Sequence, residues 1–320
     1  MKQKEILLFG GTGQIGRNLV RKLSENNYKI TVVTRNLHQS GYILKTQANP
    51  GYLNLIEMNN FNMKKISSLM ENIDICINLV GILYEKKKDE FKLIHTDFPN
   101  MLSKLAKTHQ IKKFIHVSSL GIENAIDSKY AQSKLEGENT VRNNFSKSII
   151  LKPSIVYSVD DKFTTNFMSL LSLLPFMPLY YSGKTKFIPI HVIDLVNIIM
   201  NVIEIESEGI TIECVGPETL SFKEILRKLL RSIDKKRLLI PLPMPIAKFS
   251  AKLLQLLPKP ILTEDQLRTL KYDNILSGKY KSNFDIGIKA EKFFENEINK
   301  YSFNWRSGGQ FSKETKKKIL

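Results

Sequence analysis

Apolar runs alternate with amphipathic stretches through the first half of the chain. Long segments with helical periodicity, such as residues 89–110 and 128–145, separate most of the apolar runs. This alternation predicts a parallel sheet covered by helices on both faces, whose ligands bind at the carboxyl ends of the strands. The runs predicted as strands are EILLFG, KITVVTR, YLNLIEM, IDICINLVG, KKFIHVSS and SIILKPSIV.

The rhythm changes beyond about Val159. Residues 165–181 are apolar and interrupted by proline, residues 186–204 return to a strand followed by a helix, and residues 210–230 add another such pair. We therefore predict a doubly wound α/β domain with a small C-terminal α/β lobe. The predicted boundaries are 1–159 for the domain, completed by about 186–205, then 160–185 and 206–305 for the lobe and 306–320 for a flexible basic tail.

Three glycines follow the first predicted strand at a fixed spacing: Gly10, Gly13 and Gly16 in FGGTGQIG. The next residues place Leu19 and Leu23 on one face of a predicted helix. Glycine allows positive φ, close approach of a ligand to the backbone and tight packing of helix on strand. The unpaired N–H groups and the positive dipole end of the helix then face the turn, which favours a bound pyrophosphate.

The end of the second predicted strand bears on the choice of nucleotide. An acidic side chain there would bind the ribose 2′-hydroxyl of NAD, but the chain has Thr34, Arg35 and Asn36. A guanidinium can neutralise a 2′-phosphate with a charge-assisted bond. The sequence therefore favours NADP(H), with NAD(H) as the alternative; the competing interpretation of Arg35 is a solvated loop residue.

Tyr130 and Lys134 lie four residues apart in a predicted helix, so their side chains share one face. An ammonium group beside a phenol stabilises the phenolate and lowers the pKa of the phenol toward neutral pH. Such a tyrosine can exchange a proton with a carbonyl or an alcohol. Upstream, Ser118 and Ser119 end a predicted strand, where a hydroxyl can bond the substrate oxygen. The alternative is an ordinary surface helix.

The order of these motifs is informative. The glycine turn, NLVG at 78–81, VSS and YAQSK together resemble the layout of the short-chain dehydrogenase/reductase superfamily. INLVGILYE, FIHVSSLGI, YAQSKLEGE, LKPSIVYS, FIPIHVIDL and LTEDQLRTLKYDNI further resemble its atypical extended branch, which contains the nucleotide-binding accessory subunit of respiratory complex I and bacterial relatives. The resemblance extends from Lys4 to about Tyr301.

The resemblance implies a Rossmann domain, bound NADP(H) and a lobe that shapes the substrate cleft. The residues it assigns to the pyrophosphate loop are Gly10, Gly11, Thr12, Gly13, Gln14, Ile15 and Gly16. It places Arg35 at the 2′-phosphate, Asn59 near the adenine, Val80 and Gly81 along the adenosine, and Tyr130, Lys134, Ser118 or Ser119, Pro153 and Ser154 around the nicotinamide.

Two departures from the pattern matter. Asn59 stands where many members have Asp, and Lys152 where Arg is usual. The stretch from serine to tyrosine is also shorter than in sugar-nucleotide epimerases, which disfavours a sugar site.

Two functions fit the sequence. The first is an NADP(H)-dependent oxidoreductase, favoured by Tyr130 and Lys134. The second, implied by the resemblance, is a non-catalytic accessory or assembly factor of a respiratory complex, stabilised by its nucleotide. Apolar, proline-broken stretches at 170–181 and 238–260, with Lys248, Lys252 and Lys259 interleaved, suggest a lipid- or quinone-like substrate or a membrane contact; the competing interpretation is lobe core.

Composition narrows the partners. The net charge is +17 and the pI about 9.6, but lysines are scattered and no nucleic-acid-binding motif is present, so we expect no nucleic-acid partner. Two cysteines form no disulfide framework, and no leader, spanning apolar run or metal-ligand spacing is seen. We expect a cytoplasmic protein, with peripheral contact at the inner face of a membrane left open, as is the oligomeric state. Asp194 is expected to cap the helix that begins there.

Overall fold

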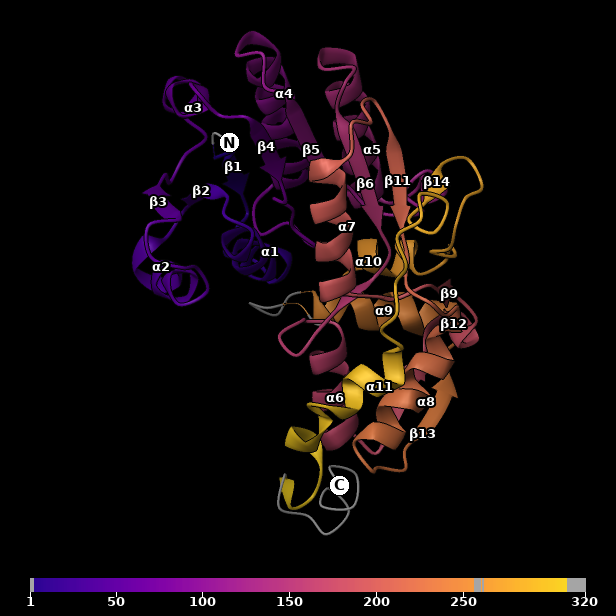
Figure 1. Ribbon diagram of the computed structural model, residues 1–320. Helices are drawn as coiled ribbons and strands as arrows, with labels where there is room; N and C mark the ends of the chain where they lie inside the picture. Colours follow the sequence, from indigo (N-terminus) through magenta and orange to yellow (C-terminus); the bar gives the residue numbers. More distant parts are fainter. Residues whose placement is uncertain (1–2, 256–259, 261, 310–320) are drawn as a thin grey trace.

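The computed structural model describes residues 3–255, 260 and 262–309 (Figure 1). Within them, eight parallel strands form one sheet in the order β14-β11-β6-β5-β4-β1-β2-β3. The predicted parallel sheet is confirmed. Its strands are β1 (Glu5–Phe9), β2 (Lys29–Thr34), β3 (Leu53–Glu57), β4 (Ile75–Asn78), β5 (Lys113–Val117), β6 (Ile149–Pro153), β11 (Thr211–Cys214) and β14 (Lys281–Ser282).

Helices cover both faces of this sheet because successive side chains of each strand point to opposite sides. From β1, Ile6 and Leu8 join a core with α1 and α7, whereas Leu7 and Phe9 join another with α3, α4 and α5. The doubly wound arrangement is thereby confirmed. The helices of this part are α1 (Gln14–Glu25), α2 (Leu37–Lys45), α3 (Met63–Met70), the π-helix η1 (Lys92–Asp97), α4 (Phe98–Thr108), α5 (Lys129–Asn144) and α7 (Val192–Glu204).

The smaller lobe has a core of its own, in which Tyr157, Phe222 and Phe294 are buried. Helices α6, α8 and α11 gather with β13 below the main sheet in Figure 1. The helical elements are α6 (Thr164–Leu173), η2 (Tyr180–Gly183), α8 (Phe222–Ser232), α9 (Met244–Leu254), α10 (Glu264–Thr269), α11 (Phe294–Asn299) and η3 (Ser302–Trp305). Short strand pairs join β7 (Val156–Tyr157) to β10 (Ile190–His191), β9 (Lys186–Phe187) to β12 (Leu220–Ser221), and β8 (Phe176–Leu179) to β13 (Leu238–Pro241).

Three details differ from the sequence expectations. Strands β11 and β14, from the stretch assigned to the lobe, instead extend the main sheet beside β6. His191, not Asp194, caps α7: its Nδ1 accepts from the N–H of Ile193 at 3.4 Å, while the Asp194 carboxylate accepts from the N–H of Lys292 at 3.1 Å. Arg306, at the start of the expected tail, donates to the carbonyl of Ser232.

The rest of the tail, residues 310–320, and Lys259 lie outside the described residues. Both cysteines are buried and unbridged, and burial raises the pKa of each thiol. Across the described part of the chain, no helix combines the length and apolar character that crossing a membrane requires.

A buried ion cluster fastens α5 to the sheet. The Lys152 side chain on β6 is fully buried, and its Nζ donates to Glu138 of α5 at 2.7 Å and to Glu123 at 2.5 Å. Glu138 is only 1% exposed and also pairs with Arg142 at 3.4 Å. Each buried charge therefore has an oppositely charged partner, and loss of one leaves another uncompensated.

We expect Lys152→Met to lower the free energy of unfolding by about 3–5 kcal/mol, because Glu138 would keep a buried charge without its main partner. The matched control is Lys112→Met: Lys112 also pairs with a carboxylate, Asp74 at 2.8 Å, but is 77% exposed. That change should stay within about 0.5 kcal/mol. Urea denaturation measures both, and equal effects would contradict the account.

Candidate active site

The glycine turn follows β1, and its three glycines differ in what they contact. Gly10 has a φ of +83°. A Cβ on Gly16 would lie 2.4 Å from the carbonyl oxygen of Gly10, so this residue must be glycine for α1 to pack on the turn. A Cβ on Gly13 would meet only that same oxygen, at 3.4 Å. Gly13 is exposed, and the protein itself does not exclude a side chain there.

The start of α1 is suited to an anion. Gly13 is its N-cap and offers no side-chain bond to the first N–H groups, so these donors remain available. The side chain of Gln14 is used within the protein, donating to the Ser158 hydroxyl at 2.9 Å. The remaining loop residues Gly11, Thr12 and Ile15 are buried or half-buried. The backbone of the turn therefore fits a pyrophosphate.

The adenosine end would lie beyond β2 and β3. Arg35 is exposed at the end of β2, and its guanidinium has no hydrogen-bond or ion-pair partner within the described part of the chain. Asn59 is exposed after β3. Glu57, which no sequence motif singled out, ends β3, and its carboxylate accepts a hydrogen bond from the N–H of Leu37 at 3.2 Å. The exposed Arg35 guanidinium is the feature at this end that suits a 2′-phosphate.

Lys134 lies at the nicotinamide end of the predicted nucleotide site, beside the loop that follows β4. Its side chain is buried, and Nζ donates to the carbonyl of Val117 at 3.2 Å. A Cβ on Gly81 would lie 3.4 Å from this Nζ, so the exposed Gly81, next to Val80, borders the amine. Burial lowers the pKa of Lys134 to about 8, opposed by Glu138.

Tyr130 stands in the first turn of α5, where its side chain lies close to that of Ser119, whose influence favours the ionised phenol. Burial raises the pKa of the phenol, contrary to the lowering expected from a neighbouring ammonium, so the phenol holds its proton at neutral pH in the protein alone. The neighbouring Ser118 extends the sheet through its N–H to Leu151, and its buried hydroxyl has no partner among the described residues. Of the two predicted serines, the structure brings Ser119 to Tyr130.

His95 was not foreseen as part of the site. It lies in η1, where its Nε2 accepts from the N–H of Ile82 at 3.1 Å and its Nδ1 is 2.9 Å from the Ser133 hydroxyl. Burial and the Lys134 charge lower its pKa to about 2, so the ring is neutral and Nδ1 carries the proton. Its ring also packs edge-on against Tyr130 at 5.4 Å between centroids. His95 therefore braces the loop beside Gly81 against α5.

Pro153 and Ser154 are buried at the end of β6. The Ser154 hydroxyl donates to Asn274 at 2.5 Å and accepts from the N–H of Ile188 at 3.3 Å, so it is engaged within the protein. Across the described residues, no group of three or more His, Cys, Asp or Glu side chains is arranged to hold a metal ion.

The comparison with protein families agrees with this geometry. The model of the NAD dependent epimerase/dehydratase family matches residues 6–211, which span the glycine turn, Ser119, Tyr130 and Lys134. The chain belongs to this family. The resemblance to extended short-chain dehydrogenase/reductases is thereby confirmed.

Relatives of this epimerase/dehydratase member include subunits of respiratory complex I. The 40 kDa subunit of mitochondrial NADH-ubiquinone oxidoreductase from Neurospora crassa is 26% identical over 284 residues, covering 88% of this chain and 74% of that protein. Ceramide reductase from Caulobacter vibrioides is 25% identical over 243 residues, covering 75% and 74%. Among solved structures, dTDP-glucose 4,6-dehydratase from Streptomyces venezuelae with NAD and TYD bound superposes with a TM-score of 0.70 at 16% identity, covering 94% and 96%.

The glycines of this family member should respond differently to alanine. Gly16→Ala should destabilise the fold by about 1–3 kcal/mol, because its methyl group collides with backbone. Gly13→Ala should fold normally and weaken NADPH binding by about tenfold or more, because its methyl group enters the space where we place the pyrophosphate. Thermal unfolding and NADPH fluorescence titration measure the two effects. Unchanged NADPH affinity in Gly13→Ala would contradict the placement.

Proposed function

We propose that this protein is an NADP(H)-dependent oxidoreductase that moves hydride between the nicotinamide and a carbonyl or alcohol of an apolar substrate. The observation that carries the proposal is the closeness of Ser119 to Tyr130 at the carboxyl end of β5, on the helix that also carries the buried Lys134. A site that only stored a nucleotide would not need an acid–base pair there. Bound nucleotide would supply the hydride.

The protein's own residues would handle the proton. In reduction, Tyr130 would donate its proton to the oxygen of the substrate as the carbonyl carbon receives hydride, while Ser119 holds that oxygen. The phenolate left behind would be stabilised by the Lys134 ammonium. Since Tyr130 is protonated at neutral pH and Lys134 is charged below about pH 8, both groups are in the form that reduction needs below that pH.

Arg35 supports NADP(H) over NAD(H). Its exposed guanidinium stands where a carboxylate would bind the ribose of NAD. Because the guanidinium is exposed, it is available to form a charge-assisted bond with a 2′-phosphate. Several solved structures of similar fold contain NAD, so NAD(H) is the alternative to test.

An apolar, lipid- or quinone-like substrate is supported by the composition of the lobe and by one relative. Helix α9, in the lobe, exposes Ile246 (53%) and Phe249 (64%). The relative from Caulobacter vibrioides is named for reducing ceramide, which is a lipid.

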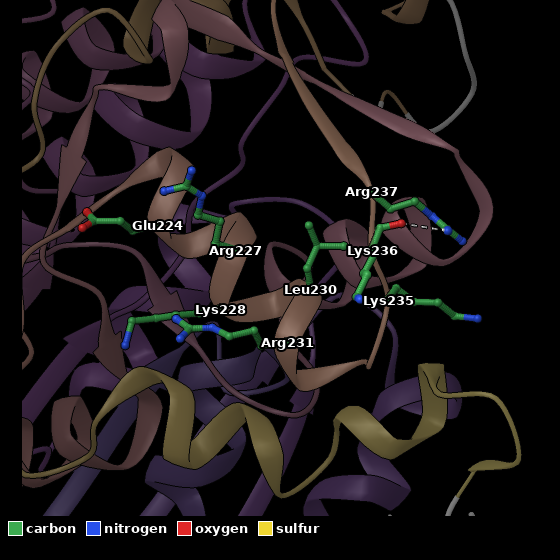
Figure 2. Close-up of a pocket in the computed structure, with 8 residues that line it drawn as sticks. All are labelled: Glu224, Arg227, Lys228, Leu230, Arg231, Lys235, Lys236 and Arg237. Atoms are coloured by element: carbon green, nitrogen blue, oxygen red, sulfur yellow. Dashed lines mark hydrogen bonds between the residues drawn. The ribbon is translucent and has the colours of Figure 1, made fainter.

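A second candidate is a nucleotide-stabilised accessory factor, and a surface of the lobe favours it. Leu173, Phe176 and Leu238 are 81%, 51% and 70% exposed near the paired strands β8 and β13. Beside them, α8 and residues 235–237, which precede β13, border a hollow of about 630 Å³, shown in Figure 2. Its lining is Glu224, Arg227, Lys228, Leu230, Arg231, Lys235, Lys236 and Arg237.

Such a basic and apolar surface suits an acidic subunit or an anionic membrane, on which the protein would lie peripherally. Mitochondrial relatives that are complex I subunits support contact with a respiratory complex. The nucleotide would then stabilise the fold by mass action without turning over.

Arg35→Ala tests the nucleotide preference. NADPH should bind about tenfold or more weakly, because a charge-assisted bond to the 2′-phosphate is lost, whereas NADH affinity should not change. Arg21→Ala, which removes another exposed cation from α1, is the control for net charge. Isothermal titration calorimetry gives all affinities. Equal weakening for both nucleotides, or none, would reject the role given to Arg35.

Tyr130→Phe tests the chemistry. With quinones, acyl carbonyls and lipid aldehydes as substrates, it should lower the rate of NADPH oxidation about 100-fold or more, because the proton donor is lost, and leave the NADPH affinity unchanged. The wild-type rate should fall as the pH rises through about 8, where Lys134 loses its proton. A wild-type protein that retains NADPH but reduces none of these compounds would instead favour the accessory factor.

A further inference from the structure

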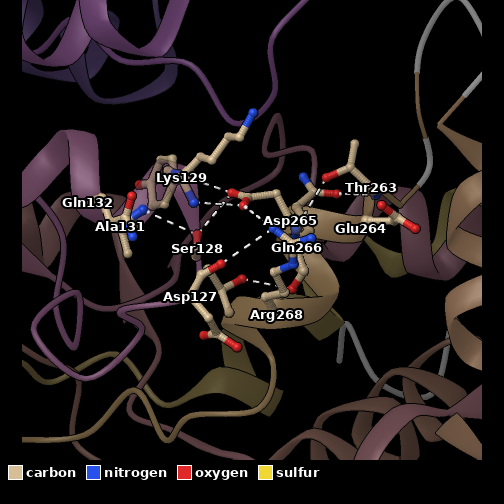
Figure 3. A network of polar contacts seen from close by, with 12 residues as sticks. Asp127, Ser128, Lys129, Ala131, Gln132, Thr263, Glu264, Asp265, Gln266 and Arg268 are labelled. Atoms are coloured by element: carbon tan, nitrogen blue, oxygen red, sulfur yellow. Dashed lines mark hydrogen bonds and ion pairs between the residues drawn. The ribbon is translucent and has the colours of Figure 1, made fainter.

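The segment 263–274, which we call the strap, contacts the start of α5, which carries Tyr130, and the backbone next to Ser119. It contains α10 and lies within the motif LTEDQLRTLKYDNI, to which the sequence analysis assigns no role. Figure 3 shows the carboxylate of Asp265 directed at the start of α5, with Ser128 and Lys129 around it. The contact joins residues about 135 positions apart.

Asp265 accepts hydrogen bonds from the free N–H groups in the first turn of α5. Its carboxylate accepts from the Ser128 hydroxyl at 2.9 Å, the N–H of Lys129 at 2.8 Å and the N–H of Tyr130 at 3.0 Å. The first N–H groups of a helix have no acceptor within the helix, so the backbone of Tyr130 is held by this outside carboxylate. Its negative charge also complements the positive end of the α5 dipole.

The C-terminal end of the strap holds the backbone next to Ser119. Asn274 Nδ2 donates to the carbonyl of Leu120 at 2.6 Å, and its Oδ1 accepts from the Ser154 hydroxyl at 2.5 Å. Leu120 directly follows Ser119. One segment thus fixes the backbone next to both members of the Ser119–Tyr130 pair.

The strap is itself fastened to α9. Leu267 is 2% exposed and packs with the buried Ala247 and Ala251 of that helix. Thr263 and Gln266 form a capping box that begins α10 next to Asp265. The packing of α10 on α9 therefore connects Asp265 to the lobe.

We propose that Asp265 is a positioning residue that couples the lobe to the reactive end of α5. By anchoring the backbone of Tyr130, Asp265 sets where the phenol stands relative to Ser119 and to the substrate, while Asn274 steadies the serine side. The inference rests on the proposed oxidoreductase function for its catalytic consequence, but the anchoring itself can be measured without turnover.

The experiment compares Asp265→Ala, Asp265→Asn and Glu264→Ala. Glu264 is the matched control, because it precedes Asp265 on the same helix and its carboxylate makes no hydrogen bond or ion pair to any residue that the structure describes. In the full-length protein with NADPH, Asp265→Ala should lose hydrogen-exchange protection at residues 129–132. It should also lower kcat by about 10-fold to 100-fold with the NADPH affinity unchanged, since the reacting groups are misplaced. Glu264→Ala should match the wild type.

Asp265→Asn keeps a hydrogen-bond acceptor without the charge, so its exchange protection and kcat should lie between those of Asp265→Ala and Glu264→Ala. This variant also provides the test if Asp265→Ala fails to fold. Exchange at residues 129–132 and a kcat that both match Glu264→Ala would overturn the proposal. A wild type without turnover would reject the oxidoreductase function instead, and exchange alone would then decide whether Asp265 anchors Tyr130.

Discussion

The desolvated face of α5 is the constraint on which the candidate site depends. Besides apolar side chains, this helix buries the charged side chains of Lys134 and Glu138 against β5 and β6. Such burial is tolerable because Lys134 donates to the carbonyl of Val117 and Glu138 pairs with Lys152. With α5 fixed in this way, Tyr130 is held in the first turn beside Ser119 and the lowered pKa of Lys134 follows from the same burial.

The order of the strands places this face next to the glycine turn. Strands β2, β1, β4 and β5 are neighbours, so the residues after their carboxyl ends follow one edge of the sheet. Arg35, Gly13, Gly81 and Ser119 come from these four ends in that order. An extended dinucleotide matches such a line, with its 2′-phosphate at one end and its nicotinamide at the other. The basic and apolar surface of the lobe is separate from this line and serves the alternative function.

Much of this fold could be predicted because it is encoded locally. Buried parallel strands appear as short apolar runs, and a glycine turn between strand and helix has a recognisable spacing. The choice between Ser118 and Ser119 could not be predicted, because adjacent residues at a strand end point in different directions. The short strands β11 and β14 are defined by the strands they pair with. His95 contacts Ser133, 38 positions away, and Asp265 contacts Tyr130, 135 positions away. No local pattern encodes such contacts.

A crystal structure of the complex with NADPH would show whether one nucleotide reaches from the glycine turn to both Arg35 and Tyr130. We expect the pyrophosphate against the backbone of Gly13 at the start of α1, the 2′-phosphate at Arg35, and the nicotinamide ring beside the Tyr130 hydroxyl and the Lys134 amine. A nucleotide bound elsewhere, or one whose ring lies beyond the reach of Tyr130, would contradict this placement.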